Sequence, residues 1–168
     1  MNNVFKDSRG SLLPINIEEI PFDVKRVFSV FGVPKGMVRG EHAHYQTKQY
    51  LVCVKGSIKV ILESIKKQIT EVILEEGDSI FIDNLVWDAQ QFLTGDDIML
   101  VFANTEYNLE DYILDKKDYI QTQIGNPDGD NIPNKKYYDP RAWLRKGEEA
   151  FVARLKKAFE DLNNVDTL

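Results

Sequence analysis

The sequence predicts an all-β domain of the sandwich or barrel type, followed by a C-terminal helical extension. Up to about residue 103, short apolar or alternating runs are separated by turn-forming residues, with no sustained helical period. The runs begin about ten residues apart, a spacing typical of sandwiches and barrels, jelly rolls included. The chain changes character after residue 120, so we expect one domain over 1–120 and an extension over 121–168.

The predicted strands follow one another with turns between them. Clusters of Gly, Pro and Asp, such as those at 34–36 and 94–96, supply the turns. In one strand Ile58, Val60 and Leu62 alternate with more polar residues, which predicts a sheet with one face on the core. The expected strands cover residues 11–17, 24–33, 40–44, 49–55, 57–63, 69–74, 79–82, 86–92 and 97–103.

The extension begins with a loop and continues into a predicted helix. Residues 125–131 are too rich in helix breakers to be regular structure. Asp139 and Pro140 form a good helix start, because Asp caps the first turn and Pro is tolerated at the first helical position. Beyond Gly147, apolar residues at helical spacing predict an amphipathic helix that packs on the barrel or on a second subunit. This stripe consists of Phe151, Leu155, Ala158, Phe159 and Leu162.

Composition argues against several classes of function. The formal net charge is −6 and the 21 Lys and Arg residues are scattered, so we expect no nucleic-acid partner. No run approaches the roughly 20 apolar residues of a membrane span, and the first residues lack the apolar core of a signal peptide. We therefore expect a cytoplasmic protein with no membrane partner. The single Cys53 lies in an apolar run and predicts a buried thiol without a catalytic role.

Both histidines of the chain lie in one predicted strand, at His42 and His44. Because successive side chains of a strand alternate, the two imidazoles project to the same face. The order His42, His44, Gln49 and Gly56 has the spacing of the first cupin motif, although Gln49 stands where that motif usually has Glu. A chance pair on a surface strand is the plain alternative. The motif spacing favours a functional pair.

Metal binding and proton transfer are the two chemistries open to this pair. Gln49 is a weak ligand, and residues 77–88, where a second cupin motif would end in His, contain none. A site of two His and Asp88, of the kind that holds non-haem iron, stays open as an alternative. We expect no metal and no other cofactor, because two imidazoles in an apolar barrel are suited to move a proton between neighbouring carbons beside a ketone.

Such a reaction also needs hydrogen-bond donors that hold the enediolate. Arg39 and Gln49 are available. Arg39 precedes His42 by three positions and would point to the opposite face of an ideal strand. A bulge at Gly40 would reset the alternation and bring Arg39 to the histidine face, whereas without one Arg39 is a surface residue.

At these residues the sequence resembles the cupin-fold dTDP-4-keto-6-deoxyglucose 3,4-ketoisomerases. The most specific element is Arg-Gly-Glu-His-Ala-His at 39–44, and the likeness spans roughly residues 4–120. Supporting segments are 7–12, 25–28, 54–57, 86–87, 100–107 and 110–113. The resemblance implies a cupin-type jelly-roll β-barrel, a homodimer, no metal, and a dTDP-linked sugar as substrate. It also implies a place in the synthesis of deoxyamino sugars such as those of O-antigens.

The resemblance further implies roles for individual residues. His44 corresponds to the base that removes the proton at sugar carbon 3, His42 is its partner, and Arg39 lies near the substrate. For Trp87 the plain alternative is a core aromatic. The residues expected to contact the sugar nucleotide are Arg26, Ser29, Gln49, Trp87 and Asp88.

Two departures from the family leave other functions open. Phe28 stands where family members usually carry a tyrosine, and Asp88 begins an unusual run after Trp87. An epimerase of the same sugars is one alternative, although it would use a Tyr acid opposite the His base. A non-catalytic cupin that binds a nucleotide sugar, or a partner protein through its C-terminal helix, is the other.

Overall fold

The computed structural model describes residues 4–63 and 69–124. The chain divides into two compact units, Met1–Ile132 and Pro133–Leu168, and every described residue belongs to the first. The helix predicted within 139–162 lies outside the described residues. The elements are β1 (Phe5–Asp7), β2 (Gly10–Leu12), β3 (Arg26–Phe31), β4 (Val38–His44), β5 (Gln49–Lys55), β6 (Ser57–Glu63), β7 (Ile69–Glu75), β8 (Ser79–Ile82), β9 (Trp87–Phe92), β10 (Ile98–Ala103), β11 (Tyr112–Ile113) and α1 (Lys116–Ile124), with 3-10 turns at Ile17–Glu19 and Leu109–Asp111.

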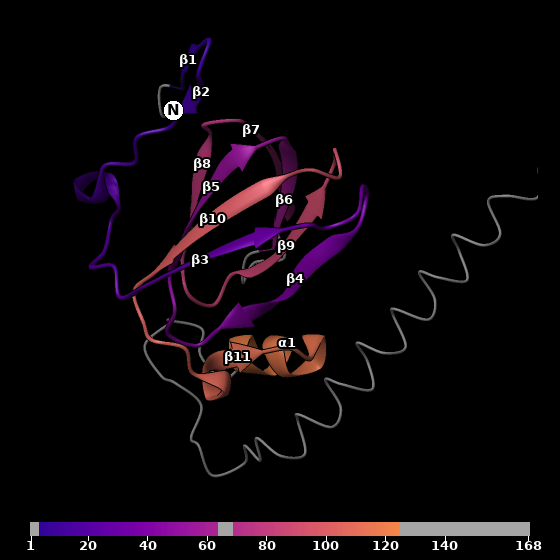
Figure 1. Cartoon of the computed structure of the whole chain (residues 1–168). Coiled ribbons are helices and arrows are strands. Elements are labelled where there is room, and N and C mark those ends of the chain that lie inside the picture. The colour runs from indigo at the N-terminus through magenta and orange to yellow at the C-terminus, as the bar shows by residue number, and fades with distance from the viewer. Residues whose placement is uncertain (1–3, 64–68, 125–168) are drawn as a thin grey trace, which may run out of the picture. The chain divides into compact units, whose positions relative to one another are not determined.

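Two antiparallel sheets face each other around an apolar interior (Figure 1). One sheet has the strand order β3-β10-β5-β8 and the other the order β11-β4-β9-β6-β7, while β1 and β2 form a separate hairpin. Apart from the hairpin of β6 and β7, neighbouring strands in each sheet are not consecutive in the sequence, as in a jelly roll. The predicted all-β class is confirmed, and eight of the nine predicted strands occur within a few residues of their expected bounds.

The prediction for the first strand is wrong, because the observed strand is much shorter than the predicted one. A strand was expected over 11–17, but β2 ends at Leu12 and a 3-10 turn follows at Ile17–Glu19. Pro14 interrupts the run, because it has no N–H to give to a neighbouring strand. The apolar residues of this segment pack instead on Val52 and Phe102 of the first sheet, together with Ile20.

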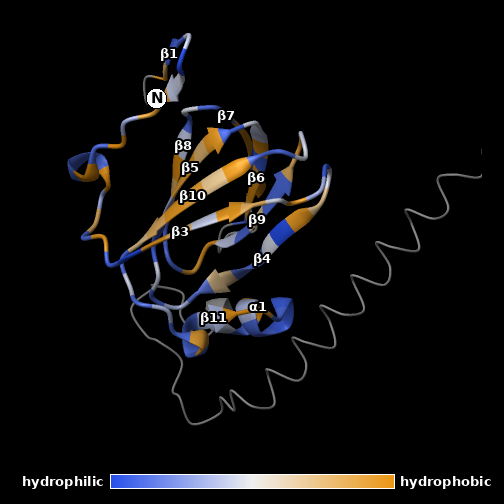
Figure 2. Cartoon of the chain, viewed as in Figure 1, coloured by the Kyte–Doolittle hydropathy of each residue, from blue (hydrophilic) through white to orange (hydrophobic). Residues whose placement is uncertain are grey.

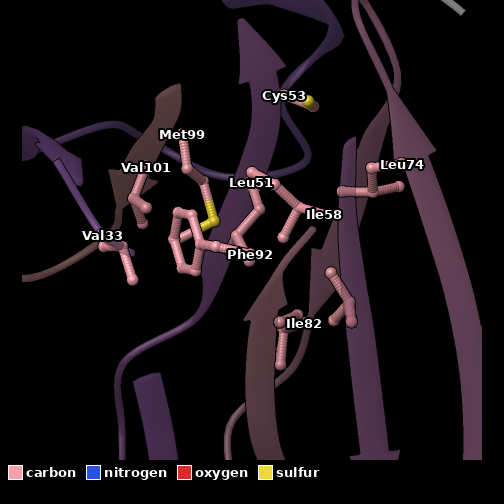
Figure 3. Packing of buried hydrophobic residues seen from close by; sticks show 10 residues of the cluster. Val33, Leu51, Cys53, Ile58, Leu74, Ile82, Phe92, Met99 and Val101 are labelled. Carbon is pink, nitrogen blue, oxygen red and sulfur yellow. The ribbon is translucent and has the colours of Figure 1, made fainter. Parts of the chain in front are cut away.

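Both sheets contribute side chains to the apolar core. Leu51, Cys53 and Met99 come from the first sheet and Ile58 and Phe92 from the second, and all five are at most 3% exposed. Figure 3 shows these side chains pointing into one space between the strands. Burial raises the pKa of Cys53 to about 12, so this thiol is inert, as its apolar surroundings predict.

After β10 the chain turns back and ends the described part with α1. Tyr119 of α1 is buried and donates its hydroxyl to the carbonyls of Glu63 and Leu85, at 2.9 and 3.0 Å. Lys116 forms an ion pair of 2.6 Å with Glu63. Much of α1 is hydrophilic (Figure 2), and among the residues placed by the structure no helix is long and apolar enough to cross a membrane.

Candidate active site

The strand that carries both histidines contains a β-bulge. Gly40 pairs with Ala89 and His42 with Asp88, so Glu41 is the extra residue between two successive pairs. Gly40 and Glu41 both have positive φ, 81° and 58°. Because a bulge adds one residue to the strand, side chains before it point to the opposite face from the one they would have in a regular strand, relative to the side chains after it.

The bulge brings Arg39 to the histidine face. Arg39 pairs with Gln90 and His42 with Asp88, and side chains directly opposite in an antiparallel pair project to the same side. Gln90 and Asp88 are two residues apart on β9 and share that side. The predicted effect of Gly40 is therefore confirmed, and the Arg39 side chain is exposed on this face.

Three side chains from β4 and β5 meet at one nitrogen. His42 Nε2 lies 3.2 Å from His44 Nε2, and Gln49 Nε2 lies 3.2 Å from the same atom of His44. The imidazole rings meet edge to face, with centroids 4.9 Å apart. His44 and Gln49 are 3% and 7% exposed, whereas His42 is half-buried. The same-face prediction for the two histidines is confirmed.

A buried carboxylate holds the other side of His44. Asp111 Oδ2 lies 3.0 Å from His44 Nδ1, and Asp111 also accepts hydrogen bonds from the backbone N–H groups of Gln46 and Thr47, at 2.7 and 3.2 Å, and from the Thr47 hydroxyl. Since a carboxylate only accepts, His44 Nδ1 carries the proton and Nε2 keeps its lone pair. The Asp111 carboxylate thereby sets the orientation of the ring, with Nε2 of His44 facing His42 and Gln49.

The pKa values of Asp111 and His42 are both shifted by their surroundings. Burial works to raise the pKa of Asp111, but its hydrogen bonds with His44 and Thr47 outweigh burial and hold the pKa below the ordinary range. Burial lowers the pKa of His42, while the nearby charge of Asp88 partly opposes that effect. A neutral His42 and an ionised Asp111 are therefore both favoured at neutral pH.

Asp88 lies opposite His42 and is 1% exposed. It accepts a hydrogen bond from the Gln90 side chain, and burial raises its pKa despite the nearby histidines. Among the residues that the structure describes, no group of three or more His, Cys, Asp or Glu side chains has the arrangement of a metal site. The alternative donor set of His42, His44 and Asp88 is therefore not assembled in this part of the chain.

An aromatic and cationic cluster borders the histidine pair. Tyr112 of β11 is the register partner of His44, and its ring centroid lies 4.4 Å from that of His44 and 5.0 Å from that of His42. The Arg26 guanidinium lies 5.2 Å from the Phe28 ring and 5.6 Å from the Tyr107 ring. The charge of Arg26 also acts on the Tyr112 phenol and works to lower its pKa. Arg26 thus joins the site through Tyr112.

Two of the residues expected at the site lie elsewhere. Ser29 is exposed on the side of β3 opposite to that of Arg26 and Phe28. Trp87 packs against Tyr119 of α1 with centroids 5.4 Å apart, and Lys116 Nζ lies 4.1 Å from the Trp87 ring. The contacts with substrate expected for Ser29 and Trp87 gain no support from these positions.

Asp111 and Tyr112 are functional candidates that sequence reasoning missed. Residues 110–113 enter the sequence analysis only as a segment of the family likeness, and the structure places a 3-10 turn at Leu109–Asp111 followed by the two-residue strand β11. A strand of two residues has no detectable period. The position of Asp111, 67 residues after His44, can be found only from the fold.

Comparisons with known proteins identify the family and the fold. The family described as FdtA, WxcM-like, C-terminal, matches residues 1–123. The crystal structure of QdtA from Thermoanaerobacterium thermosaccharolyticum, a sugar 3,4-ketoisomerase in complex with TDP, is 31% identical with a TM-score of 0.66, and the match covers 74% of this chain and 92% of QdtA. A 3,4-ketoisomerase from Helicobacter canadensis is 28% identical with a TM-score of 0.65, over 73% of this chain and 93% of that one.

A different likeness concerns a smaller part of the chain. A fructose-bisphosphate aldolase from Campylobacter jejuni is 59% identical over 58 residues, which is 34% of this chain and 16% of the aldolase. The chain thus spans about a sixth of the length of the curated relatives it matches. The similarity to the ketoisomerases extends over a much larger share of this chain, and their cupin-like fold is the one described above.

Proposed function

Because this chain belongs to the FdtA family of WxcM-like C-terminal domains, we propose that it is a sugar 3,4-ketoisomerase acting on a dTDP-linked 4-keto-6-deoxyhexose. The observation that carries the proposal is the orientation of His44. Its Nδ1 is held by Asp111 at 3.0 Å, and its Nε2 lies 3.2 Å from His42 Nε2. A basic lone pair with a second imidazole beside it is what proton transfer between two neighbouring carbons requires.

In the proposed mechanism His44 Nε2 takes the proton from sugar carbon 3, which is acidified by the ketone at carbon 4. The negative charge moves onto the carbon 4 oxygen, and an enediolate forms. A proton then returns to carbon 4, while the hydroxyl at carbon 3 loses its proton and becomes the new ketone. The C3–H and O3–H bonds break, and the C4–H and O4–H bonds form. His42, in contact with His44, shares the proton during the transfer.

The chain's own donors stabilise the enediolate in this scheme. Arg39 lies on the face of His42, and Gln49 places its amide nitrogen 3.2 Å from His44 Nε2. Donors fixed in advance near a developing oxyanion typically lower the barrier more than any other single feature. The reaction so described needs no metal and no organic cofactor, and we propose that this chain uses none.

A dTDP-linked sugar is the substrate we propose because of what the relatives bind. A His→Asn variant of QdtA was crystallised in complex with TDP-4-keto-6-deoxyglucose, and it is 33% identical to this chain with a TM-score of 0.64. Arg26 is a suitable side chain to hold a charged or polar part of such a ligand, because its Nε is buried and has no hydrogen-bond partner among the described residues. The product would serve the synthesis of deoxyamino sugars in the cytoplasm.

We also propose a homodimer. Val27 and Phe31 on the edge strand β3 are 51% and 68% exposed, and Phe5 and Leu12 of the β1–β2 hairpin are 58% and 64% exposed. Apolar side chains gathered at a sheet edge and on a projecting hairpin are common at subunit interfaces. Sedimentation equilibrium is expected to give twice the chain mass for the wild-type protein, and a monomer would contradict this part of the proposal.

The function is tested with TDP-4-keto-6-deoxyglucose in deuterated water, followed by NMR of the sugar. We expect the carbonyl to migrate from carbon 4 to carbon 3. Deuterium at carbon 3 or 5 without migration would indicate an epimerase or simple exchange. Binding without any exchange would mean that the chain is a non-catalytic cupin, and both results would overturn the proposed reaction.

A further inference from the structure

Tyr112 is the one phenol that contacts both imidazoles within the described residues. Its ring centroid lies 4.4 Å from that of His44 and 5.0 Å from that of His42. The contact is fixed by the backbone, because β11 pairs with β4 and sets Tyr112 directly opposite His44. Tyr112 is half-buried, so its side chain borders the site without being enclosed in the core.

A cation supports the hydroxyl of Tyr112. The charge of Arg26 acts on the phenol, and the guanidinium is itself placed by the Phe28 and Tyr107 rings, at 5.2 and 5.6 Å. A guanidinium can only donate a hydrogen bond, so the phenol keeps its own hydrogen for another acceptor. A nearby cation polarises the O–H group and makes it a better donor.

The proton of Tyr112 is also retained at neutral pH. Burial raises the pKa of this phenol, and the charge and hydrogen bond of Arg26 offset only part of the increase. Tyr112 is therefore a neutral hydrogen-bond donor at neutral pH. No acceptor for this hydrogen is identified among the described residues, and the free Nε of Arg26 is equally without a partner there.

From this geometry we propose that Tyr112 is a catalytic residue that donates its phenolic hydrogen bond to the sugar oxygen that becomes negatively charged in the enediolate. The proposal rests on the ketoisomerase function above and deepens it. The phenol reaches the site from β11, beside the reacting imidazoles. It supplies there a hydroxyl that Phe28 of β3 does not provide.

The test compares Tyr112→Phe with the wild-type protein and with Tyr50→Phe as a matched control. Tyr112→Phe keeps the ring that packs on the imidazoles and removes only the oxygen. Tyr50→Phe removes a half-buried phenol that lies 2.6 Å from the Ser79 hydroxyl, among residues that pack outside the histidine site. For each protein kcat and KM are measured with TDP-4-keto-6-deoxyglucose, TDP binding by calorimetry, and folding by Tm.

We expect Tyr112→Phe to lower kcat by about 10²-fold, the usual effect of removing one oxyanion donor, with KM and TDP affinity within a few-fold of wild type. Tyr50→Phe should keep the wild-type kcat. A kcat within about threefold of wild type in a folded Tyr112→Phe protein would overturn the role of Tyr112 and leave the ketoisomerase function intact. If the wild-type protein itself neither exchanges nor isomerises the sugar, both the function and the role of Tyr112 are wrong.

Discussion

Asp111 Oδ2 lies 3.0 Å from His44 Nδ1, although the two residues are 67 positions apart in the chain. This contact decides which nitrogen of His44 is basic, because the carboxylate accepts the Nδ1 proton and leaves the lone pair on Nε2. The turn at Leu109–Asp111 and the pairing of β11 with β4 hold the carboxylate in this position. The basicity of His44 Nε2 on β4 therefore depends on the short segment formed by this turn and β11.

Replacing Asp111 by Asn should test this dependence directly. The amide can donate to Nδ1 and so favours the tautomer with the lone pair on the wrong nitrogen, which typically lowers kcat by 10²-fold or more. A lower Tm is also expected, since Asp111 accepts hydrogen bonds from the Gln46 and Thr47 N–H groups as well. The variant is measured by steady-state kinetics and thermal unfolding.

Glu106→Gln is the matched control for Asp111→Asn, because Glu106 is an exposed carboxylate in the same stretch of chain. This control is expected to behave as wild type in both measurements. If a folded Asp111→Asn protein keeps the wild-type kcat, Asp111 does not set the tautomer of His44.

The bulge at Gly40 is expected to be essential for the geometry of the site. Gly40 has φ +81°, and a Cβ added there would lie 2.7 Å from Gln90 Oε1 and 3.1 Å from the Asp88 carbonyl oxygen. Gly40→Ala should therefore lower the free energy of unfolding by about 1–2 kcal/mol because of the left-handed backbone, and by about 1–3 kcal/mol more because of the crowding. Most of the activity should be lost as well. Urea unfolding and kcat measure the two effects.

Gly36→Ala separates backbone strain from crowding. Gly36 has the same φ of +81°, but nothing lies within 4 Å of its added Cβ. The free energy of unfolding of this variant should fall only by the cost of the left-handed backbone, about 1–2 kcal/mol, and its kcat should stay unchanged. Equal losses of stability in the two variants would contradict the close approach of Gly40 to β9.

The pH dependence of stability should reflect the lowered pKa of His42. Burial favours the neutral imidazole, so the stability contributed by this group is present above pH 6.5 and is lost as the pH falls through the lowered pKa. His42 is accordingly expected to stay neutral below pH 6.5. The Cε1–H resonance of His42 reports its titration by NMR.

Asp88→Asn offers an internal check on that titration. The charge of Asp88 raises the pKa of His42, so its removal should lower that pKa further and move the protonation of His42 to more acidic pH. A His42 that titrates at 6.5 or above in the wild-type protein would contradict the burial described here. No change in its pKa in Asp88→Asn would show that the two side chains are not coupled.

The sequence alone predicts those parts of the site that depend on one strand and its nearest turn. Alternation puts His42 and His44 on one face, motif spacing points to Gln49, and the glycine before Glu41 marks the bulge that turns Arg39 toward them. Each of these predictions uses residues within about ten positions of the others, the range over which local periodicity holds.

The remaining parts depend on contacts between distant segments. Asp111 reaches His44 from a short 3-10 turn and Tyr112 from the two-residue strand that follows it, and no periodicity reveals either element. Trp87 was expected beside the substrate, but α1 places Tyr119 and Lys116 against it. Since an aromatic at a strand end packs equally well on a helix or on a ligand, its partner was decided by the position of α1.

The most direct test of the account follows the exchange of the carbon 3 proton of TDP-4-keto-6-deoxyglucose in deuterated water, with wild-type protein and with His44→Asn. His44→Asn removes the base and leaves a polar side chain of similar size, so the variant should remain folded and bind TDP. We predict that wild-type protein exchanges the proton and moves the carbonyl to carbon 3, while His44→Asn does neither. Exchange by His44→Asn at the wild-type rate would contradict the assignment of His44 as the base.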